Sequence, residues 1–94
     1  IIDTVLPDKY GIFNIFPNPF NPVVNITYSV SVNSNVQIIL YDLYGGYITS
    51  LINEFQNSGY HEISWNASYL PSGVYLIKLI YGELTDTKKI VLLK

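Results

Sequence analysis

The single histidine, His61, is the first residue whose type could support catalysis or metal binding. A metal site needs further ligands at suitable spacing, and His61 has no such partner beyond the adjacent Glu62. Adjacent residues of a strand point to opposite faces of a sheet, so these two side chains cannot readily converge. The sequence therefore favours a structural role for His61.

The acidic residues are the next candidates, because paired carboxylates can hydrolyse glycosidic bonds and clustered carboxylates can bind calcium. They are scattered along the chain, mostly in predicted loops, and none follows the Asp-x-Asp-x-Asp spacing of a calcium loop. We expect them to be solvated surface groups: Asp3, Asp8, Asp42, Glu54, Glu62, Glu83 and Asp86.

Two short segments share residue types with known active sites, but each lacks the necessary context. Ser72-Gly73 would offer a nucleophile within a Gly-x-Ser-x-Gly turn between a strand and a helix, and that pattern is absent. Gly45-Gly46 would hold a phosphate in front of a helix, and no helix is predicted there. The sequence therefore predicts no catalytic residue, no cofactor site and no metal site, and we expect that the chain is not an enzyme.

The aromatic residues leave two interpretations open. A row of exposed rings on a sheet could stack on sugars or on a partner protein. Alternatively, a small core without methionine or cysteine is filled by tyrosine rings whose hydroxyls stay in water. We favour the second interpretation for the aromatic residues near predicted loops and strand ends: Tyr44, Tyr47, Tyr60, Trp65, Tyr69 and Tyr81.

Composition limits the classes of protein that the chain can represent. Its 94 residues suffice for one domain. The formal net charge of −2 argues against a nucleic-acid partner, and no stretch has the roughly 20 apolar residues of a transmembrane segment. The chain starts without methionine, so we interpret it as part of a longer protein. Residues 1–9 are then expected to be a linker from a preceding part of that protein, and residues 10–94 are expected to be the folded domain, which we expect to be monomeric.

Apolar residues alternate with polar ones and are interrupted by turn residues at short intervals, which is typical of strands. No segment shows a capped helical period. Seven strands spaced in this way predict an all-β, immunoglobulin-like antiparallel β-sandwich. The predicted strands cover residues 11–16, 25–30, 36–41, 47–52, 74–81 and 84–93. A loop at residues 53–58 leads to Gly59 and to a further strand in which His61, Ile63 and Trp65 alternate.

Three prolines within six residues mark residues 17–22 as a special segment. Proline fixes φ and lacks a backbone N–H, so this segment cannot lie inside a sheet. We predict a rigid extended turn that is anchored by a buried Phe20.

Several segments, taken in order, resemble the type A C-terminal sorting domain of the type IX (Por) secretion system, which is related to immunoglobulin-like flagellar hook-capping domains. They include the proline segment, the strand at residues 36–42, the glycine hairpin, the Trp-Asn pair, Ser-Gly-Val-Tyr at residues 72–75 and the Lys-Lys-apolar end. The positions that carry the resemblance are Pro17, Asn18, Pro19, Phe20, Asn21, Pro22, Asp42, Gly45, Gly59, Trp65, Gly73 and Tyr75.

Two departures from the family pattern accompany the resemblance. Gly46 stands where the family usually has arginine, which puts in doubt any contact that needs a charge at this hairpin. Val30-Ser31-Val32 replaces the usual Leu-Pro turn, and we expect it to loosen the exit of the second predicted strand, residues 25–30, without changing the fold.

The resemblance implies a sorting signal and no reaction. Such a domain directs its passenger across the periplasm to the outer-membrane secretion apparatus, and a sortase-like peptidase commonly removes it. The passenger then stays on the cell surface or is released. We expect the C-terminal edge to carry the receptor contacts, through Lys88, Lys89 and Lys94.

Two alternatives to a cleaved signal remain at the level of sequence. The domain could be a permanent structural module of a secreted multidomain protein. It could also be a carbohydrate-binding accessory module of a secreted enzyme, and a row of three exposed coplanar rings would favour that function.

Overall fold

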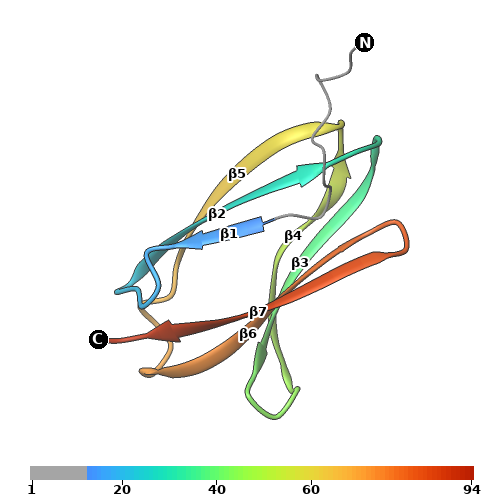
Figure 1. Cartoon of the computed structure of the whole chain (residues 1–94). Helices are drawn as coiled ribbons and strands as arrows, with labels where there is room; N and C mark the ends of the chain where they lie inside the picture. The colour runs from blue at the N-terminus through green and yellow to red at the C-terminus, as the bar shows by residue number, and fades with distance from the viewer. Residues whose placement is uncertain (1–12) are drawn as a thin grey trace.

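The computed structural model describes residues 13–94, which form two packed sheets (Figure 1). The predicted linker, residues 1–9, lies outside the described residues. The seven strands are β1 (Phe13–Phe16), β2 (Val23–Val30), β3 (Ser34–Asp42), β4 (Tyr47–Gln56), β5 (Gly59–Asn66), β6 (Gly73–Tyr81) and β7 (Leu84–Leu92).

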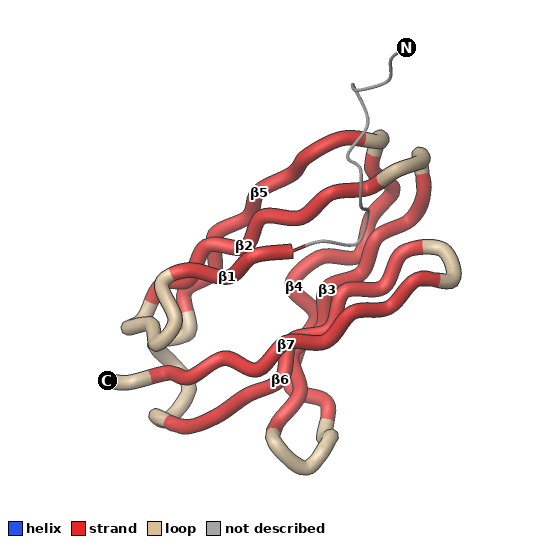
Figure 2. The backbone as a smooth tube through the Cα atoms, in the orientation of Figure 1, coloured by secondary structure: helices blue, strands red, loops and turns tan. Residues whose placement is uncertain are grey.

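The strands form one sheet in the order β1-β2-β5 and a second in the order β4-β3-β6-β7. All neighbouring strands are antiparallel. Figure 2 shows the two layers, with short loops at their ends. In a constant-type immunoglobulin domain the fourth strand lies beside the fifth, whereas β4 here pairs with β3. The predicted all-β sandwich is confirmed.

The core lies between the sheets and is built from alternating residues of the central strands. Every second residue of β6 from Tyr75 to Tyr81 is buried, as expected for a strand with one face toward a core. The inward-facing residues of β2 and β3 complete it, and Val24, Ile26, Val36, Ile38 and Leu40 have no exposed surface. This alternation accounts for the success of the strand predictions.

The fourth strand differs from its prediction. Residues 53–56 were predicted to lie in a loop, but β4 continues to Gln56 and pairs with β3 over its whole length. The register shifts twice, which leaves Ile48 and Leu51 without direct partners on β3. Both extra residues nevertheless pack against the core. Such bulges bend an edge strand and interrupt the alternation of apolar and polar residues, so the strand was predicted to end four residues too early.

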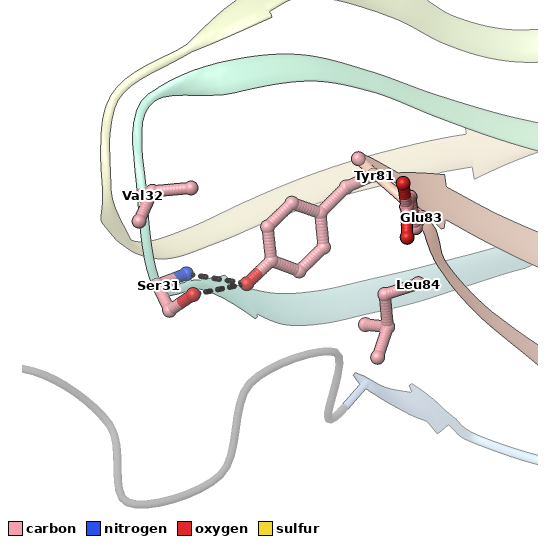
Figure 3. A pocket seen from close by; sticks show the side chains of 6 residues that line it. Ser31, Val32, Tyr81, Glu83 and Leu84 are labelled. Carbon is pink, nitrogen blue, oxygen red and sulfur yellow. Dashed lines mark hydrogen bonds between the residues drawn. The ribbon is translucent and has the colours of Figure 1, made fainter.

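The end of the sandwich at which β2 turns into β3 is fastened by a tyrosine. Tyr81 is buried, and its hydroxyl accepts a 2.8 Å hydrogen bond from the backbone N–H of Ser31 and also contacts the Ser31 hydroxyl (Figure 3). The backbone N–H of Ser31 thus links the exit of β2 to β6 through a contact that a proline at this position could not make. The hydroxyl of Tyr81 was expected to stay in water, but it is hydrogen-bonded to Ser31.

Candidate functional site

The proline segment lies along the outer edge of the last strand. Phe20 forms a parallel bridge with Leu92. Its N–H donates to the carbonyl of Val91 at 2.9 Å, and its carbonyl accepts from the N–H of Leu93 at 3.0 Å. A segment that cannot enter a sheet thus covers the free edge of one, which is a position that proline-containing chains can occupy.

Asn18 extends this junction with its side chain. Its amide oxygen accepts a hydrogen bond from the N–H of Val91 at 3.0 Å, and its amide nitrogen donates to the carbonyl of Lys89 at 3.2 Å. The amide therefore pairs with the β7 backbone as a neighbouring strand would. Its partners are more than 70 residues away along the chain. The sequence therefore revealed the proline motif but could not predict that Asn18 binds the last strand.

Phe20 is the anchor of the segment, as predicted. Only 2% of its surface is exposed, and its ring lies 6.4 Å from that of Trp65. The ring of Trp65 in turn packs in a T-shaped arrangement with the ring of Tyr69, with 6.3 Å between the ring centroids. The chain is also tied by its backbone here, because the N–H of buried Ala67 donates to the carbonyl of Pro22 at 2.9 Å.

The Ser-Gly-Val-Tyr segment contributes a tyrosine corner to the same end of the molecule. The hydroxyl of Tyr75 donates to the carbonyl of Pro71 at 2.6 Å, which closes the loop before β6 onto the start of that strand. Immunoglobulin-type sandwiches use this bond at the equivalent corner. Burial raises the pKa of Tyr75 above its ordinary value. Gly73, at the first position of β6, pairs with Leu92 of β7.

The three lysines predicted to dock a receptor do not form one cluster. Lys88 and Lys89 are adjacent on β7 and therefore point to opposite faces. The carbonyl of Lys89 is held by Asn18, so Lys89 borders the proline segment. Lys94 lies beside the β5–β6 loop, where its Nζ donates to the carbonyl of Ser68 at 2.6 Å and its N–H donates to the hydroxyl of Ser72 at 3.0 Å.

These contacts bring segments from three parts of the sequence together at one end of the sandwich. We call it the signature end, and define it as residues 17–22, 65–75 and 89–94. Figure 1 shows the turn before β2, the β5–β6 connection and the C-terminus near one another. Within the proline segment, Pro17, Pro19 and Asn21 are exposed and Pro22 is half-buried, so the segment presents an accessible surface at this end.

Asp42 and the glycines after it form a separate feature, the turn between β3 and β4. One carboxylate oxygen of Asp42 accepts from the N–H groups of Tyr44 and Gly46, at 2.9 and 2.8 Å. Gly45 has a φ of 88°, which favours glycine and lets the turn close. A methyl group on Gly46 would lie 2.7 Å from the Asp42 carboxylate, so the absence of a side chain there gives the carboxylate room.

Gly59 and His61 lie toward the opposite end of the molecule. Gly59 faces Val30 at the end of β2 and has a φ of 127°. His61 stacks on the buried ring of Tyr28 at 5.4 Å and donates from Nε2 to the carbonyl of Asn57 at 2.7 Å. These contacts agree with a structural histidine. Residues 13–94 contain no group of three or more His, Cys, Asp or Glu side chains arranged to hold a metal.

Among the described tyrosines, Tyr41 is half-buried and the other seven fall into two sets. Tyr28, Tyr75 and Tyr81 fill the core, whereas four others are more than 60% exposed. The ring contacts of the exposed tyrosines are perpendicular, as between Tyr41 and Tyr47 at 82° and between Trp65 and Tyr69 at 80°. In the described part of the chain these contacts supply no coplanar pair, which a sugar-stacking row would require. The exposed set is Tyr44, Tyr47, Tyr60 and Tyr69.

Comparison with known proteins identifies the family. The family model described as "Secretion system C-terminal sorting domain" matches residues 14–93. No curated protein and no solved structure matches the chain significantly. No helix among residues 13–94 is long and apolar enough to cross a membrane. The match covers most of the chain, including the signature end up to Leu93, and so the chain belongs to the family of C-terminal sorting domains of the type IX secretion system.

Proposed function

We propose that this chain is a non-catalytic sorting domain that directs a passenger through the bacterial outer membrane for surface attachment or release. The outer-membrane secretion apparatus recognises the folded domain, and a sortase-like peptidase then separates it from the passenger. The family assignment supports the general role of a type IX sorting signal and export to the cell surface or beyond. Members of such a family are generally non-catalytic.

One observation carries the proposal that the signature end is the part recognised. Segments that match the family are far apart in sequence, yet they meet through Asn18, Phe20 and Trp65. Tertiary contacts of this kind make the shape of the end depend on a folded sandwich. A receptor that reads this end therefore accepts folded domains and rejects unfolded chains.

The lysines supply the charge of this surface. Lys89 and Lys94 are exposed and belong to the signature end, and Lys88 is exposed on the other face of β7. An acidic receptor surface would be attracted to this edge, and complementary charge raises the rate of encounter. We propose that Lys89 and Lys94 make the principal contacts and that Lys88 contributes less.

The test must alter charge without damaging the fold. Removing residues 88–94 would delete Ile90 and Leu92, which are fully buried, so a loss of secretion would report unfolding. We would instead fuse residues 1–94 to a periplasmic fluorescent reporter in a host with a working type IX system. The fusion carrying Lys89→Gln and Lys94→Gln is compared with one carrying Lys78→Gln, which removes a lysine outside the signature end.

We expect secretion of the unmodified fusion and of the Lys78→Gln control, and at least a several-fold reduction for the double variant. Circular dichroism of the purified domains establishes that all are folded. Periplasmic retention of the unmodified fusion with a folded domain would contradict the sorting function and favour a permanent structural module. Normal secretion of the double variant would contradict only the role of the lysines.

A further inference from the structure

A pocket of about 390 Å³ lies at the end of the sandwich away from the signature end. It is formed by the turn after β2 and the turn between β6 and β7 (Figure 3). Its lining is Ser31, Val32, Tyr81, Gly82, Glu83 and Leu84. This pocket is separate from every contact described for the signature end.

The lining selects an apolar occupant. The Tyr81 hydroxyl is already bonded to Ser31, so the ring of Tyr81 presents its carbon surface to the pocket. Val32 is 59% exposed. Covering an apolar side chain of this kind would be stabilising, because it removes apolar surface from water. Leu84 is partly buried and continues the apolar wall into the core. The pocket therefore resembles a small section of core that lacks a cover.

The register of β1 shows toward which end of the sandwich its first residue lies. Phe13 pairs with Tyr28 and Phe16 pairs with Asn25 in an antiparallel ladder. Within β1, Phe13 is therefore the residue nearest to the end of β2 and to Ser31. The first residue of β1 thus lies toward the end of the sandwich that holds the pocket.

The sequence before β1 contains a suitable occupant. Residues 1–12 include the apolar pair Val5-Leu6, seven to eight residues before Phe13. Seven residues of extended chain span at most about 25 Å, which is ample for a segment that starts at the pocket's own end of the sheet. We propose that Val5 and Leu6 dock in the pocket between Val32 and Leu84, so that the linker binds to the sandwich that it precedes.

Docking would control access to the linker. A protease needs an extended, accessible segment, and a linker that is bound to the sandwich is cut only after it opens locally. The docking is tested on the chain alone, whereas its consequence for maturation rests on the proposed function. A chain that proves inactive in sorting could still show the docking, and the reverse also holds.

Trypsin provides the test, because Lys9 is the only lysine or arginine before β1. The protein comprising residues 1–94 is digested, and the rate of cleavage after Lys9 is measured by mass spectrometry. Three variants are compared with the unmodified chain: Val32→Asp in the pocket, Val5→Ser with Leu6→Ser in the linker, and all three changes together. Leu43→Asp is the matched control, since it changes an apolar turn residue that is 51% exposed and far from the pocket.

We expect the pocket variant and the linker variant each to be cut about tenfold faster than the unmodified chain, in keeping with the loss of partly buried apolar side chains. The combined variant should be no faster than the faster of the two, because both remove one interaction, and Leu43→Asp should leave the rate unchanged. Additive rates, or a Val32→Asp rate equal to that of Leu43→Asp, would overturn the proposal. Circular dichroism of each variant before digestion establishes that the sandwich is folded, and Val32 is exposed enough to change without opening the core.

Discussion

The signature end and the β3–β4 turn both match the sorting family, but they hold their shapes by different means. At the signature end, Asn18 and Phe20 bind backbone groups of β7, more than 70 residues away. In the β3–β4 turn, the carboxylate of Asp42 binds backbone N–H groups two and four residues further along the chain. The turn exposes 95% of Tyr44, whereas Phe20 is almost completely buried. A family motif can therefore record either a tertiary junction or a local turn, and the two should respond differently to mutation.

The largest effect is expected from Phe20→Ala. This change leaves a cavity beneath the proline segment and removes the contact with Trp65. It should lower the free energy of unfolding by about 3–5 kcal/mol, as measured by urea denaturation. Phe55→Ala, at a position that is 65% exposed, is the matched control and should change it by less than about 1 kcal/mol. Equal effects of the two changes would show that Phe20 is not an anchor.

Tyr75→Phe tests the tyrosine corner. It removes the hydroxyl that binds the carbonyl of Pro71, and should lower the free energy of unfolding by about 1–2 kcal/mol in urea denaturation. The ring stays, so the core is filled in both proteins. Tyr44→Phe changes an exposed hydroxyl and should have no measurable effect. A stable Tyr75→Phe protein with an unchanged midpoint would contradict the corner's role.

The same pair of proteins gives a pH test. Burial raises the pKa of Tyr75 in the folded state, whereas in the unfolded state it ionises near pH 10. The unfolded state therefore loses its proton first, so the stability contributed by the neutral hydroxyl is complete below about pH 10 and falls as the pH rises through the raised pKa. The stability difference between the unmodified chain and Tyr75→Phe should narrow above about pH 10 in urea titrations. A constant difference from pH 8 to 11 would contradict the shift.

Asn18→Ala should have a smaller effect on stability, and the change in the proline segment should be detectable in β7. It removes both side-chain bonds to β7, which are exposed, and should cost about 1 kcal/mol of stability. Hydrogen exchange at the Val91 amide should accelerate by about tenfold. Asn21→Ala, in the same segment, should leave that amide protected. Unchanged exchange in Asn18→Ala would separate the proline segment from the last strand.

The smallest effect is expected from Asp42→Ala. The two bonds to Tyr44 and Gly46 are lost, but no distant segment depends on them. Hydrogen exchange should accelerate at the Tyr44 and Gly46 amides only, and the free energy of unfolding should fall by about 1 kcal/mol or less. Faster exchange at Val91 in this variant would show that the turn is coupled to the signature end after all.

The sequence predicted the seven strands because period two persists wherever one face of a strand packs on the core. It failed at β4, where the bulges at Ile48 and Leu51 interrupt that period and polar Asn53 and Glu54 continue an exposed edge. A local pattern cannot register a bulge, because the extra residue is defined by its partner strand.

The candidate site was predicted only in part. The three prolines identified a rigid segment with Phe20 as its anchor, since these properties depend on residue type alone. The amide of Asn18 and the hydroxyl of Tyr81 could not be assigned, because their partners are set by the packing of distant strands. The lysines were grouped by sequence, although adjacent strand residues point apart.

The most direct test of the central claim compares the two regions as recognition surfaces. Each offers one exposed tyrosine and one exposed leucine: Tyr69 and Leu93 at the signature end, and Tyr44 and Leu43 in the turn. Each pair is changed to serine in the reporter fusion, and the secreted fraction of the folded fusion is measured in a host with a working type IX system. We predict that the signature-end pair lowers secretion several-fold and that the turn pair leaves it unchanged. Loss of secretion with the turn pair, together with normal secretion of the signature-end pair, would contradict the account.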